Sequence, residues 1–153
     1  MAKAPVQLQL EVSSVRRGYR TPRADRSVES DAGILIVAED RLVGRRLARM
    51  LTDRGYEEVR AVSRASRSLV LAHELDPGII FLDLDLPDDA YDLANALQHQ
   101  AGRDAHRLIA LTPVIDHSTR ERARRAGFER WLVTPVAEDE LDDLLRTNRD
   151  TPH

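Results

Sequence analysis

From Gly33 onward the chain alternates short apolar runs with longer amphipathic segments, and this alternation restricts the fold more than any other feature. The apolar runs cover residues 34–38, 59–62, 79–82, 108–111 and 131–133. Between them, apolar residues recur every three or four positions, as on one face of a helix, for example at Val43, Leu47 and Met50. Continuous apolar runs are typical of parallel strands that helices cover on both sides. The sequence therefore predicts an α/β fold with five parallel strands and five helices.

Turn and capping residues divide the chain at the same places. Glycines suited to the left-handed residue that ends a helix follow three helical segments: Gly55, Gly102 and Gly127. Pro77 and Gly78 mark a turn before the third strand. Residues 118–121, Ser-Thr-Arg-Glu, predict a capping box that opens the fourth helix. Because this helix is mostly charged and has only Ala123 and Ala126 to bury, we expect it to be exposed and loosely held.

Length and composition predict one domain with short extensions. The chain has 153 residues, which we divide into an N-terminal extension (1–32), a domain (33–147) and a tail (148–153). Residues 6–12 alternate as in a strand, but a flexible tail is an equal alternative. The arginines within 16–26 are typical of a solvated linker. The tail is too short for an effector domain, so we expect output through another protein.

Charge and composition exclude several classes of protein. The net charge of −3 does not favour a nucleic-acid binder. The absence of cysteine excludes disulfides, cysteine-ligated zinc, iron–sulfur clusters and thiol catalysis. The sequence has no apolar segment long enough for a signal peptide or a membrane span, so we expect a cytoplasmic protein without membrane contact.

Acidic residues follow the first and third predicted strands. Glu39 and Asp40 end the first run, and Asp83 and Asp85 follow the third. In a doubly wound sheet these strands are neighbours, and functional residues lie at their carboxyl ends. Clustered carboxylates are tolerated when a cation or water screens them, and magnesium prefers such oxygen ligands. The pattern therefore predicts a magnesium site at this edge of the sheet.

Helix capping is the alternative explanation for some of these acids. Asp40 is placed to cap the first helix, and Asp88 or Asp89 to cap the third, and capping is the preferred interpretation for these three. Asp83 instead ends an apolar run, where it would be partly buried beside Glu39 without capping a helix. We therefore favour a functional role for Asp83.

Four segments in order carry a family resemblance: residues 34–40, 80–87, 110–112 and 126–135. Over residues 33–147 the chain resembles the receiver domain of bacterial two-component response regulators. This resemblance implies a flavodoxin-like, doubly wound fold of five βα units with strand order 2-1-3-4-5. It also implies that the chain takes part in phosphorelay signal transduction.

The resemblance assigns roles around the acidic edge. It implies that Asp83 is the phosphoacceptor, which takes a phosphoryl group from a histidine of a partner kinase. The implied magnesium ligands are Glu39, Asp83 and the main-chain carbonyl of Asp85, with Asp40 as a further candidate.

The resemblance also assigns a switch to the fourth and fifth strands. Thr112 would be the hydroxyl that moves toward the phosphoryl group, and Trp131 the aromatic residue that follows it. The plain alternatives are a hydroxyl bonded to its own backbone and ordinary packing of the indole. Thr134-Pro135 is a candidate for a cis peptide bond.

Departures from the family pattern weaken the phosphorylation site. Ala38 stands where the family has the first of two acids, when the chain is aligned on Glu39. Thr134 replaces the family's lysine, which removes a charge-assisted hydrogen bond of about 1.5–3 kcal/mol. Ala90-Tyr91 occupies the region where the family has a glycine. These losses indicate a degenerate site.

We therefore predict an atypical single-domain receiver in which phosphorylation of Asp83 is weak or absent. One alternative is a normally phosphorylated, magnesium-dependent switch, and another is a magnesium-dependent phosphohydrolase on the same scaffold. We do not expect an enzyme, because the five histidines are more simply surface residues than a catalytic base: His73, His99, His106, His117 and His153.

The expected partners are proteins. A sensor histidine kinase or a downstream target is implied, and a homodimer is an alternative. The predicted contact surface combines the fourth helix, Trp131 and the fifth helix. In the fifth helix, core-facing leucines alternate with exposed acids: Leu141, Leu144 and Leu145 against Glu138, Asp142 and Asp143.

Overall fold

The structure is a computed structural model that describes residues 33–87, 89–101 and 106–150. The strands are β1 (Ile34–Val37), β2 (Val59–Val62), β3 (Ile79–Asp83), β4 (Arg107–Thr112) and β5 (Phe128–Val133). The helices are α3 (Arg41–Asp53), α4 (Ala65–Leu75), α5 (Ala90–Ala101), α6 (His117–Arg125) and α7 (Glu138–Asp150). The predictions made for residues 6–12, the 16–26 segment, Asp88, Gly102 and His153 lie outside the described residues.

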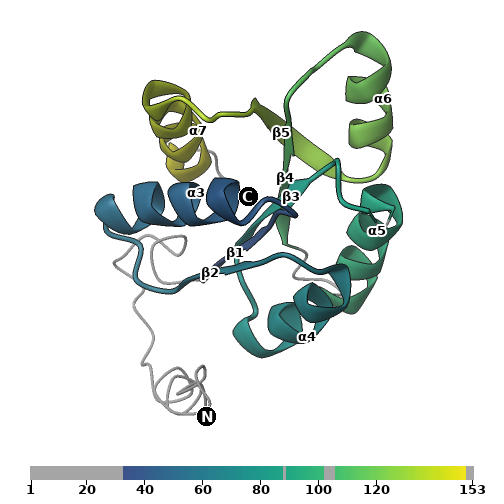
Figure 1. Cartoon of the computed structure of the whole chain (residues 1–153), viewed down its shortest axis with the longest axis horizontal. Coiled ribbons are helices and arrows are strands. Elements are labelled where there is room, and N and C mark those ends of the chain that lie inside the picture. The colour runs from purple at the N-terminus through teal and green to yellow at the C-terminus, as the bar shows by residue number, and fades with distance from the viewer. Residues whose placement is uncertain (1–32, 88, 102–105, 151–153) are drawn as a thin grey trace.

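The five strands form one parallel sheet in the order β2-β1-β3-β4-β5 (Figure 1). β1 lies between β2 and β3, with Val37 opposite Val62 on one side and Leu82 on the other. The chain therefore reverses its winding direction between β1 and β3, and the carboxyl ends of these strands meet there. The predicted fold class and strand order are confirmed.

Helices cover both sides of the sheet because the strand residues alternate between two cores. Ile34 and Ile36 point toward α3 and α7, whereas Leu35 and Val37 point toward α4, α5 and α6 (Figure 1). The predicted core leucines of α7 are buried: Leu141, Leu144 and Leu145. None of the described helices is both long and apolar enough to cross a lipid bilayer.

β5 begins three residues earlier than predicted. The charged pair Glu129 and Arg130 interrupts the apolar pattern, so the sequence places only residues 131–133 in the strand. In the structure Phe128 is 2% exposed and lies opposite Leu108 on β4, with a register irregularity directly after it. Glu129 forms an ion pair with a β4 arginine, Arg107. The cross-strand partner accounts for a charged residue in this strand.

The start of α6 corrects the predicted capping box. Asp116, two residues before Ser118, is the N-cap, and its Oδ1 accepts a hydrogen bond of 2.8 Å from the main-chain N–H of Thr119. Asp116 caps well because its short carboxylate reaches the third helical amide. The expected exposure of α6 is confirmed, since Ala123 is its one buried residue.

Left-handed residues end two of the helical segments as predicted. Gly55 follows α3 with φ 98° and Gly127 follows α6 with φ 103°. The sequence did not indicate that Asp76 would end α4 in the same way, with φ 49°. Aspartate tolerates this conformation better than most residues, but the preference is weaker than that of glycine.

Candidate functional site

Asp83 lies at the carboxyl end of β3, half-buried, with both carboxylate oxygens held by main-chain amides. Its Oδ2 accepts a hydrogen bond of 3.3 Å from the N–H of Glu39, and its Oδ1 accepts one of 2.8 Å from the N–H of Asp85. The first contact joins the ends of β1 and β3, which are neighbours in the sheet. The prediction that Asp83 lies partly buried beside Glu39 is confirmed.

Burial raises the pKa of Asp83 above the ordinary value of an aspartate. The two amide donors act in the opposite direction, because they stabilise the charged form. The carboxylates of Asp85 and Asp40 raise the pKa further through repulsion. The net result is a carboxylate that a proton or a cation would stabilise.

Two of the neighbouring acids cap helices. Oδ1 of Asp40 accepts a hydrogen bond of 2.9 Å from the N–H of Leu42 at the start of α3. Oδ1 of Asp89 accepts bonds of 2.9 and 3.2 Å from the N–H groups of Tyr91 and Asp92 at the start of α5. The capping interpretation is therefore confirmed for both acids.

The described acids do not form a ready-made metal cage. Among residues 33–87, 89–101 and 106–150, no three His, Asp or Glu side chains gather closely enough to hold a metal ion. Magnesium itself needs only one or two carboxylates and a carbonyl, with water as its other ligands. The half-buried Asp83, with exposed Glu39, Asp85 and Asp40 at the same edge, is an all-oxygen set that fits such an ion.

Thr112 ends β4 beside the site, but its hydroxyl faces its own loop. The side chain is 5% exposed, and Oγ1 donates a hydrogen bond of 2.8 Å to the carbonyl of Val114. This is the local bond that the plain alternative expects. Any movement toward Asp83 would first have to break it.

Trp131 lies on β5 opposite Ala110 and packs, half-buried, against the core on the α4, α5 and α6 side. Two residues later, Val133 is 39% exposed. Trp131 thus lies between the core and the outer surface of β5. In this position Trp131 could link changes in the core to the outer surface of β5, as a switch residue would, but the position is equally typical of ordinary packing.

The structure shows where two residues that depart from the family pattern, Ala38 and Thr134, lie. Ala38 is 2% exposed and packs under α3. The N–H of Thr134 donates a hydrogen bond of 2.9 Å to the carbonyl of Thr112, which places Thr134 at the carboxyl edge of the sheet. The Thr134-Pro135 bond is cis, as predicted.

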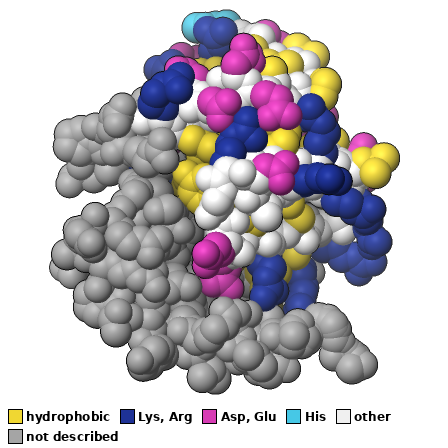
Figure 2. Space-filling model, turned by 90° about the vertical axis from the view of Figure 1, so that its left-hand side faces the viewer, with side chains coloured by type: hydrophobic (Ala, Val, Ile, Leu, Met, Phe, Trp, Pro, Cys, Tyr) yellow, Lys and Arg dark blue, Asp and Glu magenta, His cyan; other side chains and the backbone are white. Residues whose placement is uncertain are grey.

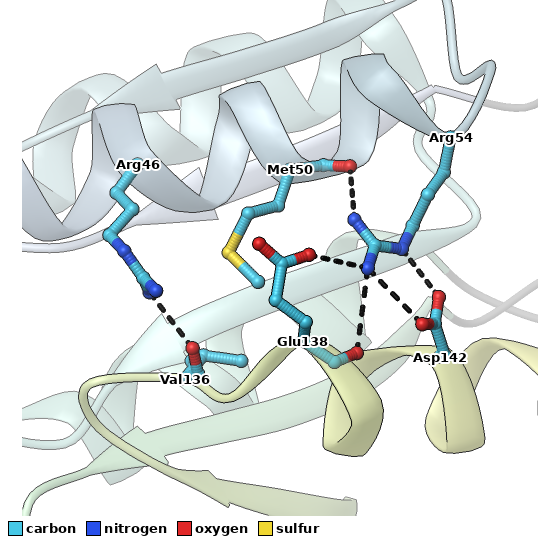
Figure 3. Close-up of polar contacts among 6 residues, drawn as sticks. All are labelled: Arg46, Met50, Arg54, Val136, Glu138 and Asp142. Atoms are coloured by element: carbon cyan, nitrogen blue, oxygen red, sulfur yellow. Dashed lines mark hydrogen bonds and ion pairs between the residues drawn. The ribbon is translucent and has the colours of Figure 1, made fainter.

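Two features were missed or misjudged at the sequence level. His106 was predicted to lie on the surface, but it is 4% exposed, with Nδ1 2.7 Å from the carbonyl oxygen of Pro77. The second is Arg54, whose guanidinium joins α3 to Glu138 and Asp142 of α7 (Figure 3). Neither residue has a sequence signal, because their partners lie 29 and more than 80 residues away.

Comparison with known proteins places this geometry in a family context. Residues 34–146 match the response regulator receiver domain. The chain is 31% identical over 114 residues to the transcriptional regulatory protein KdpE of Mycobacterium tuberculosis, covering 74% of this chain and 49% of KdpE. It is 28% identical over 125 residues to the transcriptional regulatory protein PdtaR of the same organism, covering 81% and 58%. The chain thus spans about half the length of the curated relatives it matches.

Solved structures agree on the fold. A putative response regulator from Chloroflexus aurantiacus aligns with a TM-score of 0.69 at 26% identity, covering 76% of this chain and 95% of that one. The chemotaxis response regulator CheY4 of Vibrio cholerae aligns with a TM-score of 0.68 at 22% identity, covering 75% and 96%. At 22% identity, the similarity to CheY4 shows a shared fold and nothing further.

Proposed function

This chain belongs to the response regulator receiver domain family of two-component signalling, and we propose that it is an atypical member. In this proposal Asp83 is a potential phosphoacceptor that is phosphorylated weakly or not at all. The domain acts by contact with another protein rather than by turning over a substrate. A sensor histidine kinase or a downstream target is the partner, and a second copy of the chain is an alternative one.

The observation that carries the proposal is the charge environment of Asp83. Burial and the neighbouring acids disfavour its ionised form, and within the described residues it forms no ion pair with a basic side chain. Thr134 is at the position where the family has a lysine, and Lys3 is the chain's one lysine. A phosphoryl group on Asp83 would add further negative charge without that compensation.

The remaining chemistry follows from the positions of the side chains. Asp83 would act as the nucleophile, and the amides of Glu39 and Asp85 would orient its carboxylate. Magnesium, when bound, would neutralise phosphoryl oxygens, and Asp83, Glu39, Asp40 and the carbonyl of Asp85 would hold it. Thr112 would exchange its bond to the Val114 carbonyl for one to the phosphoryl group. The missing lysine makes this exchange less favourable.

The proposed contact surface lies where β5 meets α6 and α7. In the α7 part of this surface, a hollow of about 470 Å³ is lined by Trp131 and Val133 of β5 and by acids of α7 that include Asp139 and Asp143. Arg130 approaches Asp143 at 3.9 Å across β5 and α7. Because α6 buries little, this surface can rearrange at low cost when a protein binds.

The test uses Trp131 fluorescence, which is specific because the chain has one tryptophan. Beryllofluoride with magnesium mimics the phosphorylated state, and Asp83→Asn is the control. The proposal expects little or no magnesium-dependent change, and slow labelling of Asp83 by acetyl phosphate. A saturable change that disappears in Asp83→Asn, with efficient labelling, would establish a normal receiver switch and overturn the proposal.

A gain-of-function variant sharpens this test. Thr134→Lys restores the family's cation and is expected to increase labelling of Asp83, because the lysine can bind the added phosphoryl charge. Thr134→Gln is the matched control, with a long side chain and no charge. Equal labelling of both variants would show that the missing cation is not what limits the site.

A further inference from the structure

A hollow of about 450 Å³ opens beside the edge strand β2, between the N-terminal turns of α3 and α4. Small residues form its floor, among them Ala38, Gly44 and Ala61. A methyl group added at Gly44 would lie 3.6 Å from Cβ of Ala61 and 3.9 Å from Cβ of Ala38. The small side chains therefore let α3 pack closely on the sheet at Gly44, at the base of the hollow. Its volume lies in the range of small-molecule sites, about 300–1,000 Å³.

Four arginines surround this hollow: Arg41, Arg45, Arg64 and Arg67. All four are exposed, and none of them forms an ion pair with another residue of the described part. The ion pairs that the described residues do form use other arginines: Arg54, Arg107, Arg124, Arg130 and Arg146. Since the chain as a whole has a net charge of −3, this cluster is not a consequence of a general excess of basic residues.

Basic and acidic side chains are also unevenly distributed over the face of the molecule shown in Figure 2. On the face shown in Figure 2, basic side chains gather along the right-hand and lower edges of the described part, and acidic and basic side chains mix in the middle. Mixed charges compensate one another locally, as the ion pairs of α7 do. Cations grouped around a hollow without such pairs are available to an anionic ligand.

The helix termini at the hollow also favour an anion. Arg64 is the N-cap residue of α4 and makes no side-chain capping bond, and the first turn of this helix contains no acid. The first turn of α3 also lacks an acid, although Asp40 caps it. Helix N-termini carry partial positive charge and attract anions, so the arginines at the start of α4, which has no acidic cap, are unfavourable without a bound negative charge. A ligand phosphate would compensate the charge of the arginines and accept hydrogen bonds at the N-terminus of α4, which has no side-chain cap.

We propose that this hollow binds a phosphorylated small molecule of nucleotide size. The guanidinium groups would bind its phosphates, since their planar forks match phosphate oxygens in pairs. The small apolar floor would receive a flat or compact apolar group, such as a nucleobase. The proposal is independent of phosphorylation at Asp83, although Ala38 in the floor directly precedes Glu39 at the acidic edge.

Calorimetric titration of the full chain with ADP tests the proposal, in EDTA so that metal binding at the acidic edge does not contribute. We expect saturable binding, weaker binding of pyrophosphate and very weak binding of adenosine. Arg45→Gln with Arg67→Gln should weaken ADP binding by about tenfold or more, because two charged forks are lost. The matched control, Arg120→Gln with Arg125→Gln, removes the same charge from α6 and should change the affinity by less than about twofold.

A second variant tests the apolar floor. Ala61 is exposed on an edge strand, so Ala61→Leu should fold and partly fill the hollow. It is expected to weaken ADP binding and leave pyrophosphate binding unchanged. Circular dichroism and thermal unfolding check that every variant is folded.

Several results would overturn the proposal. One is the absence of saturable ADP binding at millimolar concentration. Another is equal weakening by both double-arginine variants, which would indicate general charge attraction. Unchanged ADP affinity in Ala61→Leu would show that the ligand does not contact the apolar floor, which contradicts the proposed binding mode. A short DNA duplex could also compete with ADP for the site. If it displaces ADP at a lower total phosphate concentration than ADP itself needs to bind, the arginines bind nucleic acid instead.

Discussion

Arg54 is expected to make the largest single polar contribution to the packing of α7 on the rest of the domain. Its Nε and Nη2 donate to the two carboxylate oxygens of Asp142 at 2.5 and 3.2 Å. Nη2 also donates to Oε1 of Glu138 at 2.7 Å, and Nη1 donates to the carbonyl of Met50 at 2.9 Å (Figure 3). One side chain thus satisfies the C-terminal turn of α3 and the N-terminal half of α7 together.

The size of the stability loss expected for Arg54→Ala follows from how far the interacting side chains are exposed to solvent. The Arg54 side chain is 20% exposed, whereas the side chains of Glu138 and Asp142 are 66% and 49% exposed. Ion pairs with exposed partners contribute little, but the hydrogen bond from a charged donor to a main-chain carbonyl contributes about 1.5 kcal/mol. We therefore expect Arg54→Ala to lower the free energy of unfolding by about 2 kcal/mol. For a domain of this size that corresponds to roughly 4–8 °C in melting temperature.

Urea unfolding followed by circular dichroism measures this effect, with Arg49→Ala as the matched control. Arg49 is an exposed arginine of α3, the helix that Arg54 caps at its C-terminus, and it forms no ion pair with another described residue. Arg54→Lys should show an intermediate loss, since lysine retains the charge and lacks the fork. If Arg54→Ala is no less stable than Arg49→Ala, the network does not stabilise the packing of α7.

The pH dependence gives a second check on the same contact. The hydrogen bond from Arg54 lowers the pKa of Asp142 below its ordinary value of 3.8. A lowered pKa in the folded state means that the stabilisation is present above about pH 4 and is lost as the pH falls through the folded pKa. The stability difference between the wild type and Arg54→Ala should therefore shrink in acid. A difference that stays constant down to pH 2 would contradict this reasoning.

Three further predictions test other parts of the structure. Asp83→Asn should raise the melting temperature at pH 7, because burial raises the pKa of Asp83 and so disfavours its ionised form in the folded state. The gain should disappear as the pH falls below the ordinary pKa of 3.8, where the carboxyl group becomes protonated in the unfolded state as well. Gly44→Ala should stabilise the domain by about 1 kcal/mol in urea unfolding, since the added methyl would make an ordinary contact of 3.6 Å with Ala61 and a helical glycine is costly. Phe128→Ala should destabilise it by about 3 kcal/mol or more, because the ring is buried at the true start of β5 and contacts Tyr91 edge-on at 6.4 Å; an effect below 1 kcal/mol would argue against the observed strand boundary.

The strands and helices were predictable because they depend on residue patterns along the chain, whereas their order in the sheet was predicted from the resemblance to the receiver family. The central strands β1 and β3 and most of β4 are apolar runs that both cores require, whereas the edge strand β2 contains Arg60 and is only partly buried. In the helices, apolar residues recur every three or four positions. β5 was shortened because Glu129 breaks its run, and only the ladder with Arg107 explains that residue. The capping residue Asp116 was missed because several polar residues in a row could each begin α6.

The acidic site was predictable in part. Asp83 stands out because an acid directly after a buried run has no capping role, and the structure agrees. Which amides hold its oxygens, and that the hydroxyl of Thr112 bonds to its own loop, depend on main-chain geometry that residue types do not specify.

The sequence by itself determined the α/β fold class and the acidic residues that follow the first and third strands, because apolar periodicity depends on residue types alone. The order of the strands followed from the family resemblance carried by four sequence segments. The tertiary structure decided the contacts between distant residues. It buried His106 under Pro77, joined Arg54 to α7, and brought four arginines around a floor of small side chains. Such contacts depend on the angle and distance at which each helix packs on the sheet. A shift of a few ångströms in this packing changes which residues meet, but it does not change the periodic pattern of the sequence.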